Sequence, residues 1–370
     1  MQLLKSISIL FALILISIAI YFTKDVRLDA SSDTLIMKND KTYEYFEFYN
    51  KIFPSKNFLV LAVKSIKKID ENYINNINKL KSEINKLDNI DSTFSIVDAP
   101  ILLSNNLKIA DLNNNKIINL NNTDQNINII LEEFSKSPIF KDQLINVNKN
   151  VSSIIIYIKK NNKYENIKLK KKTLDKDLKN LKKINQEYNF EKIKNNELKK
   201  EIIANIRNII NNKNDNYEYF LGGIDMISTD TISYVKNDII IFSIAVIIFI
   251  IFVLFVIYRE IKWVFIPLIT SICSLTLMTG FIGYMKWEIT AISSNFVSLM
   301  LILSISMNIH IINNYQHNYL LESKNKVLDT FKRMFKPCIY TILTTIVAFG
   351  SLLFSNIKPI IDFGYIMIFS

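Results

Sequence analysis

Uncharged stretches long enough to cross a membrane recur at the start and in the last third of the chain. The first lies between Lys5 and Lys24, and its residues 7–22 are almost continuously aliphatic. Because a bilayer core takes about 20 apolar residues in a helix, this stretch predicts a spanning helix over residues 1–23. We interpret it as a first membrane helix rather than a removable signal peptide, because no clear cleavage site of small residues precedes Lys24.

Five further apolar stretches in residues 238–370 predict helices two to six of an α-helical membrane bundle. They cover about residues 239–258, 263–285, 289–312, 337–354 and 359–370. Trp263 and Tyr284 stand at the two ends of the third helix, where interfacial aromatic residues are expected. The last stretch is too short to span a bilayer, so we expect the sixth helix to be truncated.

The residues between the first two helices, 24–237, have the periodicity of a large α/β domain. Apolar runs predict strands over residues 58–63, 90–97, 151–158 and 217–221, and helical spacing predicts helices over residues 70–87, 123–134 and 197–210. Thr123 is the expected cap of the second of these helices. The Lys-rich residues 165–195 predict a solvated helical stretch. The order strand, helix, strand at the start indicates a split βαβ unit.

The distribution of Lys and Arg predicts an orientation in the membrane. With a cytoplasmic N-terminus, the inner loops hold most of the positive charge. The inner residues are Lys5, Arg259, Lys262, Lys324, Lys326, Lys332, Arg333 and Lys336, against Lys286 and Lys358 in the short outer loops. We therefore expect a multi-pass protein of a bacterial inner membrane, with the α/β domain in the periplasm. Residues 318–336 predict an amphipathic helix on the inner surface.

Composition narrows the class of function. The 370 residues carry a formal charge of +11, and the 49% hydrophobic and 21% charged residues are segregated along the chain, which excludes a simple soluble enzyme and a disordered chain. Lys is scattered among Asn and Ile rather than grouped with aromatic residues, so we expect no nucleic-acid partner. The two cysteines lie in apolar runs and there are two histidines, which argues against disulfides and metal sites. With no catalytic grouping and no phosphate-binding glycine loop, we expect neither enzyme activity nor a cofactor.

Local motifs in the last third resemble those of a known superfamily. They are Leu343-Thr344-Thr345, Ala348-Phe349-Gly350-Ser351-Leu352, Pro359-Ile360 and Phe363-Gly364. With Ala348 in place of a glycine, they are similar to the Leu-Thr-Thr, Gly-Phe-x-Ser-Leu and Pro-Ile-x-x-Phe-Gly signature of the resistance-nodulation-division (RND) superfamily, closest to its MMPL-like exporters. The layout of one helix, a large outer domain and a packed group of helices resembles the N-terminal half of such a protein.

The resemblance implies export of hydrophobic or lipid-like substrates, driven by the proton gradient through an acidic residue inside the membrane. The MMPL-like branch carries a Gly-Ile-Asp-Tyr-x-Ile-His-like motif in its fourth helix, and residues 304–310 match it. Ser306 stands where that motif has Asp, and a serine does not exchange a proton near neutral pH. Because such transporters are built from two repeated halves, the expected partner is a second transporter half or another copy of this chain.

Polar residues of the fourth and fifth helices are the candidates for a transport pathway. They are Ser306, Asn308, His310, Thr344 and Thr345. Ser306 and His310 are four residues apart and share a helix face, so a polar seam forms if the two helices touch there. Histidine is the side-chain type suited to a proton relay, yet His310 lies about 22 residues after Glu288, near the inner surface. Two roles therefore stay open for these residues. They form a proton relay, or they form hydrogen bonds between packed helices.

Small and acidic residues at other helix positions have expected structural roles. Gly280 and Gly283 in the third helix allow a neighbouring helix to approach closely. Asp238 and Asp362 flank spanning segments near the outer surface, where we expect them to position helix ends.

Two alternatives to an exporter half stay open from the sequence. The first is a non-transporting lipid-binding or lipid-sensing protein, which Ser306 favours, and helices two to six also resemble the sterol-sensing arrangement of the same superfamily. The second is a truncated inactive fragment, because the sixth helix ends abruptly at Ser370. Membrane lipid or a hydrophobic molecule is the expected ligand of the exporter and of the lipid-binding protein.

Overall fold

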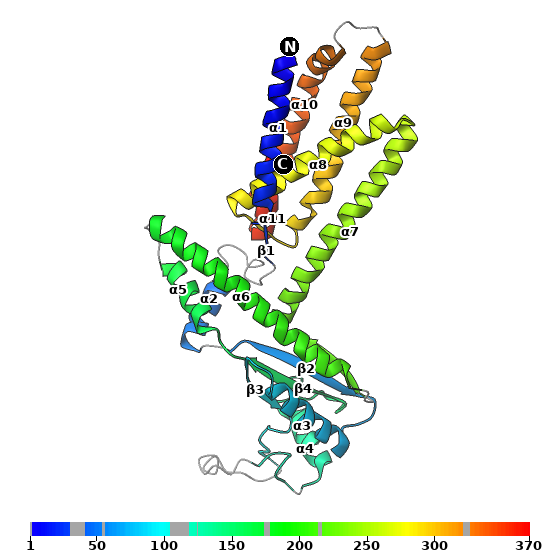
Figure 1. The fold of residues 1–370 in the computed structure, drawn as a ribbon. Coiled ribbons are helices and arrows are strands. Elements are labelled where there is room, and N and C mark those ends of the chain that lie inside the picture. Colours follow the sequence, from blue (N-terminus) through cyan, green and yellow to red (C-terminus); the bar gives the residue numbers. More distant parts are fainter. Residues whose placement is uncertain are drawn as a thin grey trace. The chain divides into compact units, whose positions relative to one another are not determined.

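The computed structural model describes residues 2–29, 41–53, 56–103, 118–123, 125–173, 178–213, 217–320 and 326–370. The chain forms two compact units. The sheet unit is Tyr49–Thr229, and the helical unit combines Met1–Phe48 with Asp230–Ser370. A four-stranded sheet organises the first, and most of the long apolar helices belong to the second (Figure 1).

The sheet unit contains four antiparallel strands. They are β2 (Phe58–Ser65), β3 (Ile90–Ser95), β4 (Val151–Ile158) and β5 (Tyr217–Gly222), in the spatial order β3-β4-β2-β5. Because β2 and β3 each pair antiparallel with β4, they run parallel to one another with β4 between them. Helix α3 (Glu71–Asn85) connects β2 to β3 along the chain. This is the split βαβ unit that the order of elements predicts.

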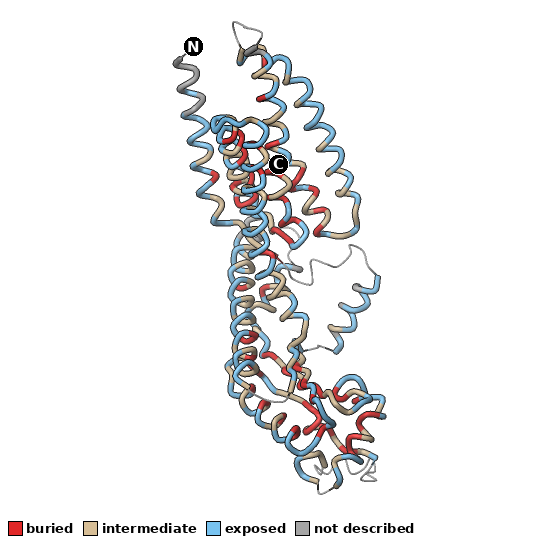
Figure 2. The backbone as a smooth tube through the Cα atoms, turned by 90° about the vertical axis from the view of Figure 1, so that its right-hand side faces the viewer, coloured by how far each residue is buried: buried red, intermediate tan, exposed pale blue. Residues whose placement is uncertain are grey.

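The core of the sheet unit joins the sheet to three helices, α3, α4 (Ile127–Lys136) and α6 (Leu178–Asn211). Leu59, Leu61 and Val63 alternate along β2 and are fully buried, as expected where successive strand residues point to opposite faces. Figure 2 draws the buried residues of the chain in red, and many of them gather within the sheet unit.

Tyr73 links α3 to the sheet through hydrogen bonds inside the core. Its hydroxyl donates to the carbonyl oxygen of Val63 at 2.6 Å, lies 2.7 Å from Ser152 Oγ and accepts from the Ser152 N–H at 3.1 Å. Asp70 caps the helix, because its carboxylate accepts from the Tyr73 N–H at 2.8 Å. Burial of the ring raises the pKa of Tyr73 to about 12, so the phenol is neutral at physiological pH.

Three helices of the sheet unit, α4, α5 (Asn162–Thr173) and α6, differ from the sequence prediction. Helix α4 begins at Ile127 rather than near Thr123, because the Asn126 side chain accepts from the Asn128 N–H at 2.9 Å and caps the first turn. Residues 165–195, predicted as one Lys-rich stretch, are divided between α5 and α6, and α6 also includes the helix predicted separately over residues 197–210. Asp124, the residue after the predicted cap Thr123, lies outside the described residues.

Six helices coincide with the apolar stretches of the sequence. They are α1 (Gln2–Thr23), α7 (Ile224–Tyr258), α8 (Ile261–Met285), α9 (Phe296–Leu320), α10 (Lys326–Gly350) and α11 (Lys358–Phe369). Among the described residues, four helical stretches are long and apolar enough to cross a membrane. These stretches are Ile224–Tyr258, Ile261–Met285, Ser293–His317 and Lys326–Phe354, while α1 contributes the shorter apolar segment Leu10–Thr23.

Helices α1 and α8 pack with almost no space between their backbones. A Cβ atom added to Gly280 would lie 2.5 Å from the Cα atom of Ala19, and one added to Gly283 would lie 1.9 Å from the carbonyl oxygen of Phe22. Any side chain larger than hydrogen would therefore push the helices apart. The expectation that these two glycines allow close helix approach is confirmed.

A short parallel ribbon ties the chain after α1 to the connection between α8 and α9. Strand β1 (Arg27–Leu28) pairs with β6 (Glu288–Ile289), and the Asp29 N–H donates to the carbonyl oxygen of Ile289 at 2.9 Å. The turn that follows leads into the short helix η3 (Ser293–Asn295), where the buried Ser293 Oγ accepts from the Thr290 N–H at 2.6 Å. These bonds fix the start of α9.

Two apolar clusters hold the helical bundle together. One joins α8, α9 and α11 through buried side chains that include Ile282, Leu301 and Ile366. The other joins α7, α8 and α9 through Leu254, Val264 and their neighbours. By contrast, many large apolar side chains of α7 are exposed, as expected of a helix that faces lipid.

Helix α10 corrects the prediction of a separate amphipathic helix before the fifth span. It runs without a break from Lys326 through Pro337 to Gly350, so the charged and apolar parts form one helix. Pro337 lies inside this helix without ending it, and Thr341 Oγ1 donates to the Pro337 carbonyl oxygen at 3.0 Å. Residues 321–325 of the predicted amphipathic stretch lie outside the described residues.

Candidate functional site

A cluster of three polar side chains connects α8 to α9 within the apolar bundle. Ser271 on α8 is buried, with 1% of its surface exposed, and its Oγ lies 2.9 Å from the Oγ of Ser304 on α9. Asn308 Nδ2 donates to the Ser304 carbonyl oxygen at 2.9 Å and lies 3.4 Å from Ser271 Oγ. Ser304 and Asn308 meet because residues four apart lie on one face of a helix. We name Ser271, Ser304 and Asn308 the hydroxyl–amide cluster.

The other candidates on α9 lie away from this cluster. Ser306 and His310 are exposed, whereas Ser304 and Asn308 are half-buried. Residues two apart on an α-helix differ by about 200° around its axis, so Ser306 and His310 face away from Ser304 and Asn308. Asn308 is therefore the one sequence candidate that takes part in the cluster.

The threonines of α10 bond within their own helix. Thr344 is exposed and Thr345 is half-buried, and both hydroxyls donate to the carbonyl oxygen of Thr341 at 2.8 Å. Helices α9 and α10 do pack together. The expected polar seam between them is not formed by these side chains, because a threonine in a helix satisfies its hydroxyl on the preceding turn. The polar connection is instead between the third and fourth apolar helices of the sequence.

Of the three residues of the cluster, Asn308 was predicted as a site residue from the sequence, and Ser271 and Ser304 were not. The signal for Ser304 was its spacing of four residues from Asn308 on an apolar helix. Ser271 had no such signal, because its role depends on which helix packs against α9. Of the two acidic residues at helix ends, Asp238 is exposed on α7 and Asp362 is half-buried on α11.

The chemistry of the hydroxyl–amide cluster is hydrogen bonding without charge. None of its three side chains ionises near neutral pH. No group of three or more His, Cys, Asp or Glu side chains that could hold a metal ion occurs in the described part of the chain. The cluster is therefore suited to joining two helices and to hydrogen-bonding a polar group or water that passes it.

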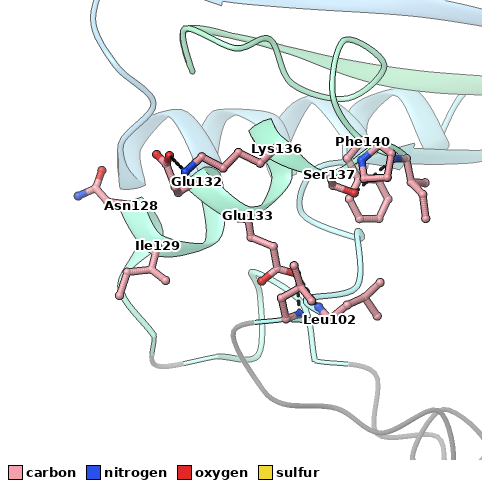
Figure 3. Close-up of a pocket in the computed structure, with 11 residues that line it drawn as sticks. Leu102, Asn128, Ile129, Glu132, Glu133, Lys136, Ser137 and Phe140 are labelled. Carbon is pink, nitrogen blue, oxygen red and sulfur yellow. Dashed lines mark hydrogen bonds and ion pairs between the residues drawn. The ribbon is translucent and has the colours of Figure 1, made fainter.

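An open groove of about 660 Å³ lies on the sheet unit, beside α4. Its lining is mostly apolar and includes three strongly exposed side chains, Leu103, Ile129 and Ile139. Glu133 shapes one wall, because its carboxylate accepts from the backbone N–H groups of Leu102 at 2.7 Å and Leu103 at 2.9 Å (Figure 3). An apolar groove of this volume is large enough for a drug-sized hydrophobic molecule.

The apolar helices and their polar cluster can be compared with known proteins. No curated protein matches this chain. The MMPL family matches over residues 179–367, which is just over half of the 370 residues. The match includes α7 to α10, the hydroxyl–amide cluster and the Leu-Thr-Thr and Phe-Gly motifs, so the resemblance drawn from those motifs is confirmed. This multi-pass, transporter-like membrane protein belongs to the MMPL family.

Proposed function

We propose that the chain is one half of an inner-membrane exporter that moves hydrophobic or lipid-like substrates with energy from the proton gradient. In this proposal α1 and α11 also belong to the membrane bundle, the N-terminus is cytoplasmic and residues 24–237 lie in the periplasm of a bacterium. The protein binds lipid or another hydrophobic substrate and is not an enzyme.

The observation that carries the proposal is the presence of polar side chains on the exposed surface of apolar helices. Ser306 and His310 on α9 and Thr344 on α10 are exposed in the isolated chain. A polar or ionisable group inside a membrane is costly when it faces lipid, and it marks a pathway when it faces protein or water. A second bundle of helices that covers this surface would solvate these groups and enclose a path between two halves.

The substrate class is supported by the groove of the sheet unit. Its exposed apolar side chains offer a surface on which a hydrophobic molecule can leave water. Figure 3 shows the charged pair of Glu132 and Lys136 at the same groove, with 2.8 Å between their charged atoms. A molecule with an apolar body and a polar end would suit this combination.

His310 is the proposed proton carrier, because Ser306 and the hydroxyl–amide cluster do not titrate near neutral pH. We expect His310→Ala to lower the transport rate at least about tenfold, since loss of a group that transfers protons removes the coupling to the gradient. The measurement is export of a fluorescent lipid analogue from vesicles with an imposed proton gradient. His317→Ala, also exposed on α9, is the matched control and should transport normally.

A non-transporting lipid-binding protein is the second candidate, favoured by the lack of a carboxyl group at Ser306. It would bind lipid with the same affinity at any membrane potential or pH, and His310→Ala would change nothing. Vesicles that hold the unaltered protein and move no lipid analogue under the gradient would argue for this candidate and against export.

Crosslinking in native membranes can test whether a second helical bundle covers the surface of α9 that carries Ser306. After replacement of Cys273 and Cys338 by serine, Ser306→Cys should react with a thiol-specific crosslinker to give a species of about twice the mass or a complex with a second half. Ile248→Cys, on an exposed apolar position of α7, is the control that should stay monomeric. Equal behaviour of the two variants would place Ser306 against lipid and contradict a paired bundle.

A further inference from the structure

A second pocket of the sheet unit has a strongly basic lining. Its volume is about 310 Å³, and it shares no lining residue with the groove beside α4. The pocket lies where β4 ends and α5 begins, next to the middle of α6, and α5 and α6 pack against each other (Figure 1). Five lysines line it: Lys159, Lys160, Lys163, Lys194 and Lys199. The acidic lining residues are Glu165 and Glu191, so the lining carries an excess of three positive charges.

Backbone hydrogen bonds give this basic pocket a fixed wall. The Ile158 N–H donates to the Asn57 carbonyl oxygen at 3.0 Å, and the Lys159 N–H donates to the Asn89 carbonyl oxygen at 2.9 Å. Asn161 begins helix α5, because its side chain accepts from the Tyr164 N–H at 3.2 Å. The first turn of α5 therefore lines the pocket, and the partial positive charge of a helix start adds to that of the lysines.

Two of the five lysines already have carboxylate partners. Lys163 Nζ lies 2.5 Å from Glu191, whose side chain is 3% exposed, and Lys199 Nζ lies 2.6 Å from Asp225. The other three, Lys159, Lys160 and Lys194, have no carboxylate partner among the described residues and are exposed at the pocket. Three unpaired ammonium groups around one cavity repel one another, and this repulsion falls when an anion enters.

We propose that the basic pocket binds a phosphate group, carried either by free phosphate or by an anionic lipid headgroup. Lys159, Lys160 and Lys194 supply the charge, since an ammonium group binds phosphate as a compact point charge. Asn side chains that also line the pocket add neutral hydrogen-bond donors. The buried Glu191 holds Lys163 in place and opposes the anion with its own charge. Binding at this site does not depend on whether the chain exports a substrate.

The test is calorimetric titration of the full chain in maltoside detergent, which contains no phosphate. The two probes are inorganic phosphate and soluble dihexanoyl phosphatidic acid, each at low and at raised salt. We expect at least one probe to bind, and its affinity to fall about tenfold or more in Lys160→Gln/Lys194→Gln, because two charges are lost. Raised salt should weaken binding to the unaltered chain more than to this variant.

Two further variants separate a phosphate site from a general effect of charge. Asn57, just before β2, lines the pocket, whereas Lys67 and Lys68 follow the C-terminal end of that strand. Lys67→Gln/Lys68→Gln removes these two exposed lysines and should change the affinity less than twofold. Glu191→Gln removes the opposing charge, and should raise the affinity several-fold. A purely structural role for Glu191 predicts no such gain.

The two probes also distinguish the source of the phosphate. Binding of both, with the same sensitivity to Lys160→Gln/Lys194→Gln, supports recognition of the phosphate group alone. Binding of phosphatidic acid alone, with that sensitivity, assigns the pocket to a lipid headgroup. The proposal is overturned when neither probe binds, or when the loss of affinity is the same in the Lys67→Gln/Lys68→Gln control.

Discussion

Gly283→Ala should destabilise the membrane bundle by about 3 kcal/mol, one of the two largest effects that we expect of a single substitution. The added Cβ would lie 1.9 Å from the carbonyl oxygen of Phe22, which is a backbone atom and has no alternative rotamer. Helix α1 must therefore move away from α8, and the packing around Ala19 is lost with it. The measurement is thermal unfolding of the purified protein in detergent, where the midpoint should fall.

Gly350→Ala is the matched control for this prediction. Its added Cβ would have no atom within 4 Å, and the residue has ordinary right-handed helical geometry. Alanine also has the better helix propensity, so the midpoint should stay the same or rise slightly. If Gly283→Ala unfolds at the same temperature as Gly350→Ala, α1 does not pack on α8 as described.

Tyr73→Phe should destabilise the sheet unit by about 2–3 kcal/mol. The substitution removes the hydroxyl that donates to the Val63 carbonyl oxygen and leaves the buried Ser152 N–H without its acceptor. The free energy of unfolding can be measured by hydrogen exchange of peptides from α3 and β4. Tyr157→Phe is the control, because the Tyr157 hydroxyl has no hydrogen-bond partner within the described residues.

Because of the same hydroxyl, the free energy of unfolding of the sheet unit falls as the pH rises in the alkaline range. The pKa of Tyr73 rises from 10.0 to about 12 on folding, so between these values the unfolded chain releases a proton that the folded chain keeps. The free energy of unfolding is therefore unaffected by Tyr73 below pH 10 and falls by about 3 kcal/mol on the way to pH 12. Tyr73→Phe should lack this part of the fall. An identical decline in the variant would show that Tyr73 ionises freely in the folded protein.

The sequence predicts the membrane helices well because their signal is local. An uncharged stretch must be helical in lipid, where each backbone group needs a partner within the same segment. Four long apolar stretches of the sequence are helices close to their predicted positions. The split βαβ order was predicted from short apolar runs on either side of a helical pattern, and the sheet has it. The predicted start of α4 was wrong, because Thr123 and Asn126 are both good N-cap residues and the helix begins after Asn126.

The site was harder to predict because it depends on helix pairing. Asn308 was identified from a polar side chain on an apolar helix, which needs no knowledge of its neighbours. The sequence did not identify its partners, which are Ser271 on α8 and Ser304 on its own helix. Threonine hydroxyls can bond within their own helix, so their presence alone does not indicate an interhelical contact.

The two-residue ribbon of β1 and β6 has a mechanical consequence for the bundle. Strand pairing joins Arg27–Leu28 to Glu288–Ile289, so the chain after α1 is held next to the segment that leads into α9. The close contact at Gly280 and Gly283 holds α1 against α8 as well. The first helix is thus joined to the start of the helix that carries Ser304 and Asn308, through the strand pairing at its end and through its close packing on α8.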